Sequence, residues 1–262
     1  MISIENQIVL VTGASSGIGA ACAKIFAKGG AKLILAARRV SKLDRLANEL
    51  ADTKLIASAS DIHLVELDVR DRPAVESAIT GLPETWQNID ILINNAGLSR
   101  GLDKLHEGNF QDWEEMIDTN VKGLLYVTRA IVPAMVSRGR GHVVNIGSIA
   151  GRQAYPKGSV YCASKAAVRA ISDGLKQDLL GTPVRVTEIE PGLVETEFSN
   201  VRFHGDAEKA QNVYRGLTPL TADDVADVVY FCATRSPHVN ISEVLLVPTD
   251  QATATLVHRN EF

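Results

Sequence analysis

The chain has 262 residues, 45% hydrophobic and 22% charged, with a formal net charge of −4 and three cysteines. This composition is typical of a globular domain that needs no disulfides, and it excludes an extended basic surface for nucleic acid. Every apolar run is shorter than the ~20 residues of a membrane helix, and residues 1–10 lack a signal-peptide pattern. We therefore expect a cytoplasmic protein with no membrane or nucleic-acid partner.

Short apolar segments alternate with longer helical patterns along the chain. The runs at 8–12 and 32–36 are continuously apolar, as in parallel strands that are covered on both faces. Further strands are predicted at 61–67, 90–93, 142–146, 184–189 and 242–247, and the clearest helices at 111–137, 159–180 and 222–234. This alternation predicts a doubly wound α/β fold of Rossmann type, with a seven-stranded parallel sheet in one domain over residues 1–262.

A glycine-rich turn follows the first strand. It reads Gly13-Ala14-Ser15-Ser16-Gly17-Ile18-Gly19, and a helix is predicted to begin near Ala20. Glycine lets the backbone approach a ligand closely, and a helix N-terminus offers free N–H groups and a partial positive charge to a phosphate. The Gly-Lys-Ser/Thr of a P-loop does not follow. The turn therefore predicts a binding loop for the pyrophosphate of a dinucleotide.

The second strand ends in Ala36-Ala37-Arg38-Arg39. An acidic residue here would bond the ribose 2′-hydroxyl of NAD, whereas an arginine would accept the 2′-phosphate of NADP. A guanidinium is always charged and matches a phosphate in a two-pronged geometry. Because these positions hold no carboxylate, we expect NADP(H) as the cofactor, bound by Arg38 and Arg39, with Arg38 contributing more.

Four polar residues follow in an order that indicates an acid–base site. Tyr161 and Lys165 are four residues apart, hence on one face of the 159–180 helix. A tyrosine with its ordinary pKa near ~10 needs a cation to stabilise its phenolate, and a lysine one turn away supplies it. Ser148 ends the 142–146 strand, thirteen residues before Tyr161, and Asn120 lies on the preceding helix.

Together with Asn94-Asn95-Ala96-Gly97 and the G-x-x-x-G-x-G spacing, this set resembles the short-chain dehydrogenase/reductase family over nearly the whole chain. The resemblance implies that Tyr161 exchanges a proton with the substrate and that Ser148 hydrogen-bonds the reacting oxygen. It also implies that Lys165 holds the nicotinamide ribose and that Asn120 anchors a proton-relay water. Asp68 would contact the adenine, and the other implied cofactor contacts are Val69, Asn95, Ala96, Gly97, Pro191, Gly192, Val194 and Thr196.

A narrower similarity lies in segments 145–151, 190–199, 201–203 and 221–226. They look like those of the NADP-dependent 3-hydroxy acid dehydrogenases, a group that acts on serine, allo-threonine or malonic semialdehyde. The resemblance implies a small hydroxy or oxo acid as substrate, and a homotetramer assembled through helices 111–137 and 159–180. The alternatives are a reductase of sulfoacetaldehyde or of a neutral ketone, and a non-catalytic NADP sensor on the same fold.

Residues 192–219 interrupt the alternation just after a strand, where open α/β sheets bind ligands. We interpret this insertion as a substrate-side lid. An anionic substrate needs its charge met inside a closed site. Arg202, flanked by Val201 and Phe203, is the first candidate for that task, and Arg152 is the second. The six histidines have no ligand spacing, so we expect no metal site.

One short motif suggests a different class of enzyme. Residues 97–101 read Gly-Leu-Ser-Arg-Gly and formally match the nucleophile elbow of a hydrolase, with Ser99 as the nucleophile. The same residues are already explained as the continuation of the Asn-Asn-Ala-Gly segment. We therefore prefer the oxidoreductase.

Overall fold

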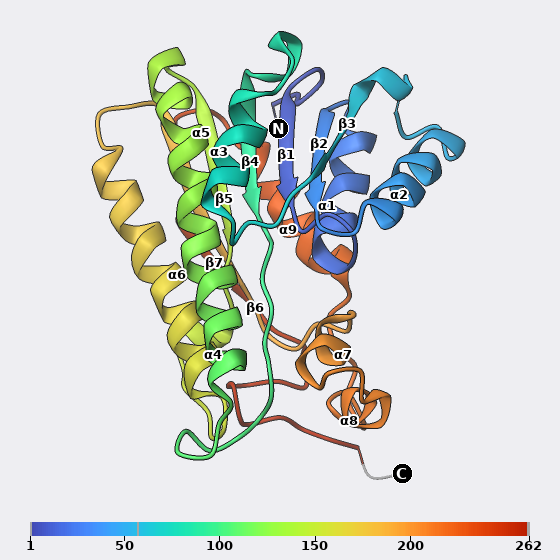
Figure 1. Ribbon diagram of the computed structural model, residues 1–262, viewed down its shortest axis with the longest axis vertical. Coiled ribbons are helices and arrows are strands. Elements are labelled where there is room, and N and C mark those ends of the chain that lie inside the picture. The colour runs from blue at the N-terminus through green and yellow to red at the C-terminus, as the bar shows by residue number, and fades with distance from the viewer. Residues whose placement is uncertain (1, 57, 261–262) are drawn as a thin grey trace.

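The computed structural model describes residues 2–56 and 58–260. Over these residues, seven strands form one parallel sheet in the order β3-β2-β1-β4-β5-β6-β7. The strands are β1 (Ile8–Thr12), β2 (Lys32–Ala37), β3 (Ile62–Glu66), β4 (Ile89–Asn94), β5 (Gly141–Ile146), β6 (Val184–Pro191) and β7 (Glu243–Leu246). The predicted doubly wound fold is confirmed (Figure 1). The strand order reverses between β1 and β4, which is where such sheets bind ligands.

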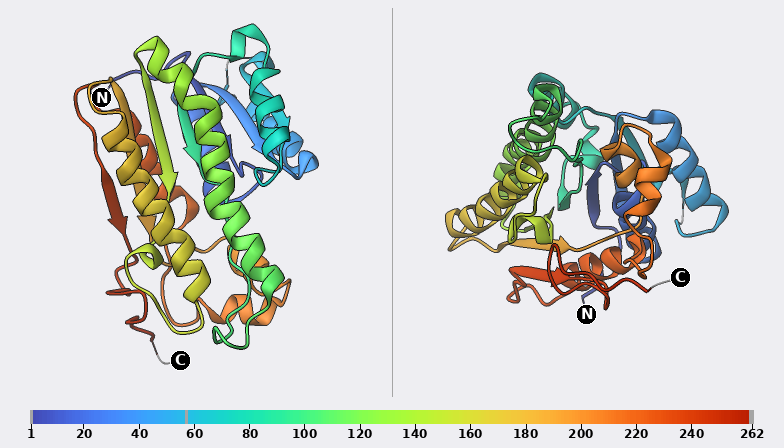
Figure 2. Two further views of the ribbon diagram at one scale, coloured as in Figure 1. Left: turned by 60° about the vertical axis from the view of Figure 1, so that its left-hand side comes forward. Right: turned by 90° about the horizontal axis from the view of Figure 1, so that it is seen from below.

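Helices cover both faces of the sheet (Figures 1 and 2). Helices α1 (Gly17–Lys28), α2 (Val40–Asp52) and α9 (Ala222–Ala233) lie on one face. Helices α3 (Arg72–Thr80), α5 (Leu124–Arg138) and α6 (Ser159–Asp178) lie on the other, and α4 (Phe110–Ile117) leads into α5. Each face has its own apolar core. Because both faces are covered, the central strands are apolar at almost every position, as the sequence predicted.

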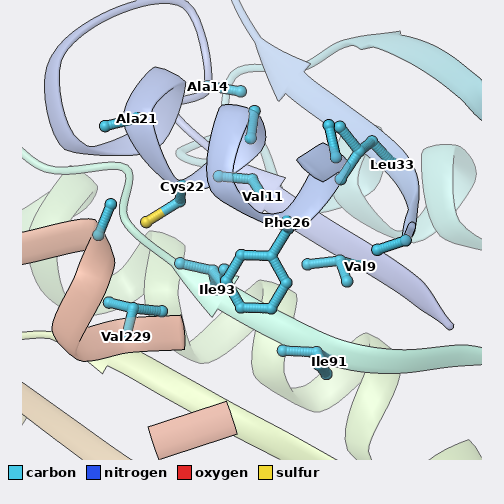
Figure 3. Close-up of a cluster of buried hydrophobic side chains, with 14 of the residues drawn as sticks. Val9, Val11, Ala14, Ala21, Cys22, Phe26, Leu33, Ile91, Ile93 and Val229 are labelled. Atoms are coloured by element: carbon cyan, nitrogen blue, oxygen red, sulfur yellow. The ribbon is translucent and has the colours of Figure 1, made fainter. Parts of the chain in front are cut away.

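The core on the α1 face is built around Phe26, which is fully buried (Figure 3). Val9 and Ile91 of the sheet and Val229 of α9 belong to the same cluster. Burying such side chains contributes roughly 1.5–3 kcal/mol each, so this core is a large share of what holds the glycine-rich turn and α1 in place.

Several boundaries differ from the prediction. Helix α1 begins at Gly17, three residues before the expected Ala20, because the glycine turn itself supplies the first helical residues. The helix predicted over 111–137 is two helices, α4 and α5, joined by a π-helical turn, Asp118–Gly123. The insertion is not irregular, since it contains the short helices α7 (Phe198–Arg202) and α8 (Ala207–Asn212). Helices of five or six residues are too short to show a period of 3.6.

Within the described part of the chain, no helix combines the length and apolar character needed to cross a membrane.

Candidate active site

A cavity of about 700 Å³ opens where the sheet order reverses, at the carboxyl ends of the strands. Most of the residues predicted for the site line this cavity. They are Gly13, Ser15, Ser16, Gly17, Ile18, Arg38, Arg39, Asp68, Val69, Asn95, Ala96, Gly97, Ser148, Tyr161, Lys165, Pro191, Gly192, Val194, Thr196 and Arg202. Gly19, Asn120 and Arg152 lie outside the lining, and the structure gives each of them a different task.

The glycine loop, residues 13–19, has the form of a phosphate cradle. Gly13 and Gly17 have φ of +66° and +54°, which favours glycine. A Cβ on Gly19 would lie 2.5 Å from the Gly13 carbonyl oxygen, so only glycine lets α1 pack this close. The Ser16 hydroxyl accepts from Arg39 at 2.8 Å and, among described contacts, does not cap α1. The first-turn amides therefore fit a pyrophosphate.

Asn95 braces this cradle from β4. Its side-chain amide donates to the carbonyl oxygens of Thr12, at 2.9 Å, and of Gly13. The Thr12 hydroxyl in turn accepts from the amides of Asn95 and Ala96, both at 3.0 Å. The ends of β1 and β4 are thus hydrogen-bonded to each other across the point where the sheet order reverses.

The two arginines after β2 are in different situations. The Arg38 side chain is 55% exposed, and its nearest carboxylate, Asp68, is 4.0 Å away. Asp68 is held instead by Arg70 at 2.6 Å. The Arg39 guanidinium is engaged, because it donates to Ser15, Ser16 and Glu197. Arg38 is therefore the guanidinium better placed to receive a phosphate.

Tyr161 and Lys165 lie on α6 and reach the cavity beside Ser148. The Lys165 ammonium donates to the Ile146 carbonyl oxygen at 2.8 Å. Burial raises the pKa of Tyr161, Tyr155 raises it further, and Arg202 and a hydrogen bond with Ser148 oppose the rise. Burial lowers the pKa of Lys165 to about 8, against the attraction of Glu188. The arrangement favours a neutral phenol, ready to donate a proton to a carbonyl oxygen.

Asn120 holds this site together from outside the cavity. Its amide donates to the Leu98 carbonyl oxygen at 2.8 Å and to the Ser164 hydroxyl at 2.9 Å, and its oxygen accepts from the Leu98 amide. Asn120 lies in the π-helical turn, and such turns are frequent at functional sites. It therefore fixes the segment after β4 against α6.

Of the two candidate arginines for the substrate, only Arg202 reaches the cavity. Its guanidinium lies 5.3 Å from the ring centroid of Tyr161 and 5.2 Å from that of Phe198, and it donates to the Tyr155 hydroxyl at 3.1 Å. Its buried Nε has no partner among the described residues.

Arg152, the second candidate, lies outside the cavity lining. It pairs with the buried Glu190 and with Glu243 of β7, so its charge is already neutralised away from the cavity. Being near Ser148 along the chain did not bring it to the substrate, because the short 3-10 helix Ile149–Gly151 turns the chain aside.

The hydrolase alternative has no support in the geometry. Ser99 is 2% exposed, and its hydroxyl faces the sulfur of Met116 at 3.9 Å. A nucleophile elbow instead presents its serine at the top of the sheet beside a histidine. Of the downstream histidines, His142 bonds Thr187 and His204 bonds Asp112.

Other cavity residues were missed by the sequence analysis. Tyr155 belongs to no motif, Glu197 lies in the similar segment 190–199 but was given no role, and a second group comes from the C-terminal segment: Gln251, Ala254, Thr255, Val257 and Arg259. The only signal for Tyr155 was its position shortly before Tyr161. Nothing in the pattern of the last residues indicated that they line the cavity.

A family model described as short chain dehydrogenase matches residues 7–207. The chain belongs to the short-chain dehydrogenase family, and the predicted enzyme class is confirmed.

Three individual proteins are similar to this chain over nearly its whole length. The chain is 50% identical over 256 residues to the NADP-dependent 3-hydroxy acid dehydrogenase YdfG of Salmonella typhi, covering 97% of this chain and 100% of that protein. It is 45% identical over 248 residues to sulfoacetaldehyde reductase 2 of Chromohalobacter salexigens, covering 94% and 96%. A solved structure described as the closed form of serine dehydrogenase complexed with NADP+ matches with a TM-score of 0.90 and 48% identity, covering 97% and 100%.

Proposed function

We propose that this enzyme transfers a hydride between NADP(H) and a small 3-hydroxy or 3-oxo acid. The cofactor is NADP(H), in keeping with the relatives named above and with Arg38 at the end of β2, where NAD enzymes carry an acidic residue. The observation that carries the substrate class is Arg202, a cation against the Tyr161 ring with part of its guanidinium unpartnered among the described residues. A planar guanidinium suits a two-oxygen anion.

The side chains divide the work as follows. When NADP(H) is bound, its nicotinamide would accept or supply the hydride. Tyr161 gives a proton to the carbonyl oxygen of an oxo acid, or takes it from the alcohol in the reverse direction. Ser148 donates a hydrogen bond to the same oxygen and stabilises its developing charge. Lys165 stabilises the phenolate once the proton has left, and Asn120 keeps α6 aligned with the segment after β4.

We also propose a domain organisation, a location and an assembly for the enzyme. The enzyme is one domain in which the insertion, residues 192–219, forms the wall over the substrate end of the cavity. It acts in the cytoplasm as a homotetramer. The assembly is supported by apolar side chains on the outer faces of α4 and α5, where Phe110 is 74% exposed and Leu125 and Val136 are also exposed.

The test is a panel of small substrates with Arg202→Ala, read at the nicotinamide absorbance. The KM for 3-hydroxy acids should rise about ten- to a hundred-fold, since a charge-assisted hydrogen bond contributes roughly 1.5–3 kcal/mol. Turnover of uncharged alcohols of equal size should barely change. Arg215→Ala, an exposed arginine of the same insertion, is the matched control.

Three outcomes would change the assignment. Equal losses on charged and neutral substrates would indicate a folding defect of the insertion, and no loss would remove Arg202 from the site. A wild-type enzyme that prefers sulfoacetaldehyde to all carboxylates would make it a sulfonate reductase, the activity of the Chromohalobacter relative.

A further inference from the structure

Glu197 connects the two walls of the cofactor cleft. It accepts from Arg39 Nη1 at 2.9 Å and from the Lys42 ammonium. Arg39 and Lys42 follow β2, whereas Glu197 follows β6, and β1, β4 and β5 lie between those strands in the sheet. We call Arg39, Lys42 and Glu197 the bridge, because together they span the cleft.

The bridge lies at the rim of the cavity, directly above the glycine loop. Arg39 and Glu197 both line the cavity, and their side chains are 45% and 44% exposed. The same Arg39 guanidinium donates to the hydroxyls of Ser15 and Ser16. Beside the bridge, Thr196 lies within 3.3 Å of the position a Cβ on Gly17 would take. The insertion therefore meets the glycine loop directly through Thr196 and indirectly through Arg39.

The charges of the bridge do not cancel the attraction for a phosphate. Two cations face one carboxylate, so a net positive charge remains, and Arg38 adds another beside it. The hydrogen bond from Lys42, opposed by burial and helped by Arg39, lowers the pKa of Glu197 to about 2. Glu197 is therefore ionised at any pH at which the enzyme works.

We propose that Glu197 is a positioning residue that closes the cleft over the cofactor by holding the start of α7 against Arg39 and Lys42. The contacts assign separate roles to these residues. Arg38 binds the 2′-phosphate, and the bridge holds the dinucleotide in the cleft whether or not it carries that phosphate. The bridge has to open for the cofactor to enter or leave. If Glu197 instead occupied the seat of the 2′-phosphate, its removal would tighten binding of NADP alone.

The other end of α7 is anchored separately. The Arg202 carbonyl oxygen accepts from the Gly101 amide at 2.9 Å, and the Val201 carbonyl oxygen accepts from Arg100 at 2.7 Å. Loss of the bridge should therefore loosen the cofactor side of α7 and leave Arg202 in place. This separates the proposal from the assignment of Arg202 to the substrate, on which it does not depend.

The experiment compares Glu197→Gln with Glu195→Gln. Glu195 is exposed two residues away, and no ion pair joins it to a described residue, so it controls for the change in net charge. Release of NADPH and of NADH is measured by stopped-flow fluorescence. We expect Glu197→Gln to release both about three- to ten-fold faster, the range of one or two partly exposed ion pairs. The KM for the hydroxy acid and the behaviour of Glu195→Gln should stay unchanged.

A second measurement needs no cofactor. The amides of Val201 and Phe203 donate to the carbonyl oxygens of Glu197 and Ser199. Hydrogen exchange of the Val201 amide in the free protein should accelerate in Glu197→Gln, as local opening at the start of α7 becomes easier, and that of the Phe203 amide at the anchored end should change less. Lys42→Met should reproduce the faster release and add little to Glu197→Gln, because the two residues act through one contact.

Two results would overturn the proposal. Tighter or slower-released NADPH with unchanged NADH would make Glu197 a competitor of the 2′-phosphate. Unchanged release of both cofactors from the folded variant would leave the bridge without a role in holding the cofactor.

Discussion

The two walls of the cofactor cleft are held by different forces. On one wall, the glycine loop is fixed by close backbone packing, with Gly19 against Gly13, and by the buried core around Phe26. On the other wall, the cofactor side of the insertion is held by the partly exposed ion pair of Glu197 with Arg39, whereas Phe198 and Val201 farther along pack against a small buried cluster. Figure 1 shows α7 and α8 standing away from the sheet, below the packed layers.

This difference indicates that the glycine loop is the more rigid of the two walls. A packed core resists even small changes in volume, so the glycine loop offers one rigid shape to a pyrophosphate. A partly exposed ion pair contributes only about 0–1 kcal/mol, so the contact of Glu197 with Arg39 can break at little cost. The enzyme thus combines a fixed cradle with a movable wall.

The largest effect should come from a change that disturbs neither wall. Tyr161→Phe keeps the ring that packs against Phe198 but removes the proton. Turnover should fall at least ~10²-fold, the usual contribution of acid–base catalysis, while NADP still binds. Single-turnover kinetics and cofactor fluorescence separate the two quantities. Near-normal turnover would exclude Tyr161 as the acid.

Replacing one glycine in each wall tests directly whether the glycine loop is the more rigid wall. Gly19→Ala puts a Cβ 2.5 Å from backbone oxygen, so it should cost about 1–3 kcal/mol of stability and weaken NADP binding at least tenfold. Gly205→Ala in the insertion has open space around it but a φ of +92°. It should lower stability by a similar amount and leave cofactor affinity unchanged. Equal effects on affinity would remove the distinction between the walls. Calorimetry and binding titration supply both values.

The arginine predicted to matter most for cofactor choice stands on the rigid side. Arg38→Ala should raise the KM for NADP about tenfold and barely alter that for NAD, the pattern of lost binding to one phosphate. Arg45→Ala, an exposed arginine of α2 outside the cavity lining, is the control. Wild-type enzyme that uses NAD as well as NADP would contradict the assignment.

The smallest effect is a pH dependence in which two carboxylates behave oppositely. Burial, helped by Glu190 and opposed by Lys165, raises the pKa of Glu188 to about 8. The folded protein then holds a proton that the unfolded chain releases near 4.5, so this residue reduces stability as pH rises from about 4.5 to about 8. Glu188→Gln should remove that loss, and its advantage in Tm over wild type should grow across this range.

The contribution of Glu197 to stability depends on pH in the opposite direction, because its pKa is lowered to about 2. Its contribution is present above pH 4.5 and is lost as pH falls towards 2. Glu197→Gln should therefore lower the Tm at pH 7 and approach wild type in acid. A constant Tm difference across pH for either variant would contradict its assignment.

The rigid wall and the catalytic pair on α6 could be predicted from the sequence because their requirements are local. Backbone crowding at Gly19 and the spacing from Tyr161 to Lys165 act within one turn or one helix, so they leave short patterns in the chain. The same locality explains why the strands were found to within one or two residues.

The adjustable wall left no such pattern. Glu197 meets Arg39 across 158 positions of sequence, and Arg259 donates to the carbonyl oxygens of Val213 and Arg215 from the last residues of the chain. These residues come together only when the chain folds, so the sequence around each of them does not indicate its partner. Arg152 shows the converse. It lies close to Ser148 in the sequence, which predicted a contact with the substrate, but in the fold it pairs with Glu190 and Glu243.

The π-helical turn at Asp118–Gly123 makes the chain unusually sensitive to its own length. Such a turn holds one residue more than the α-helix it interrupts. Deleting a single residue there would let α4 and α5 join as one regular helix, and the residues inside the turn, Asn120 among them, would change direction while the two flanking helices kept theirs. Asn120 would then face away from Leu98 and Ser164, to which it now bonds. Losing one residue at this place would therefore disconnect the segment after β4 from α6.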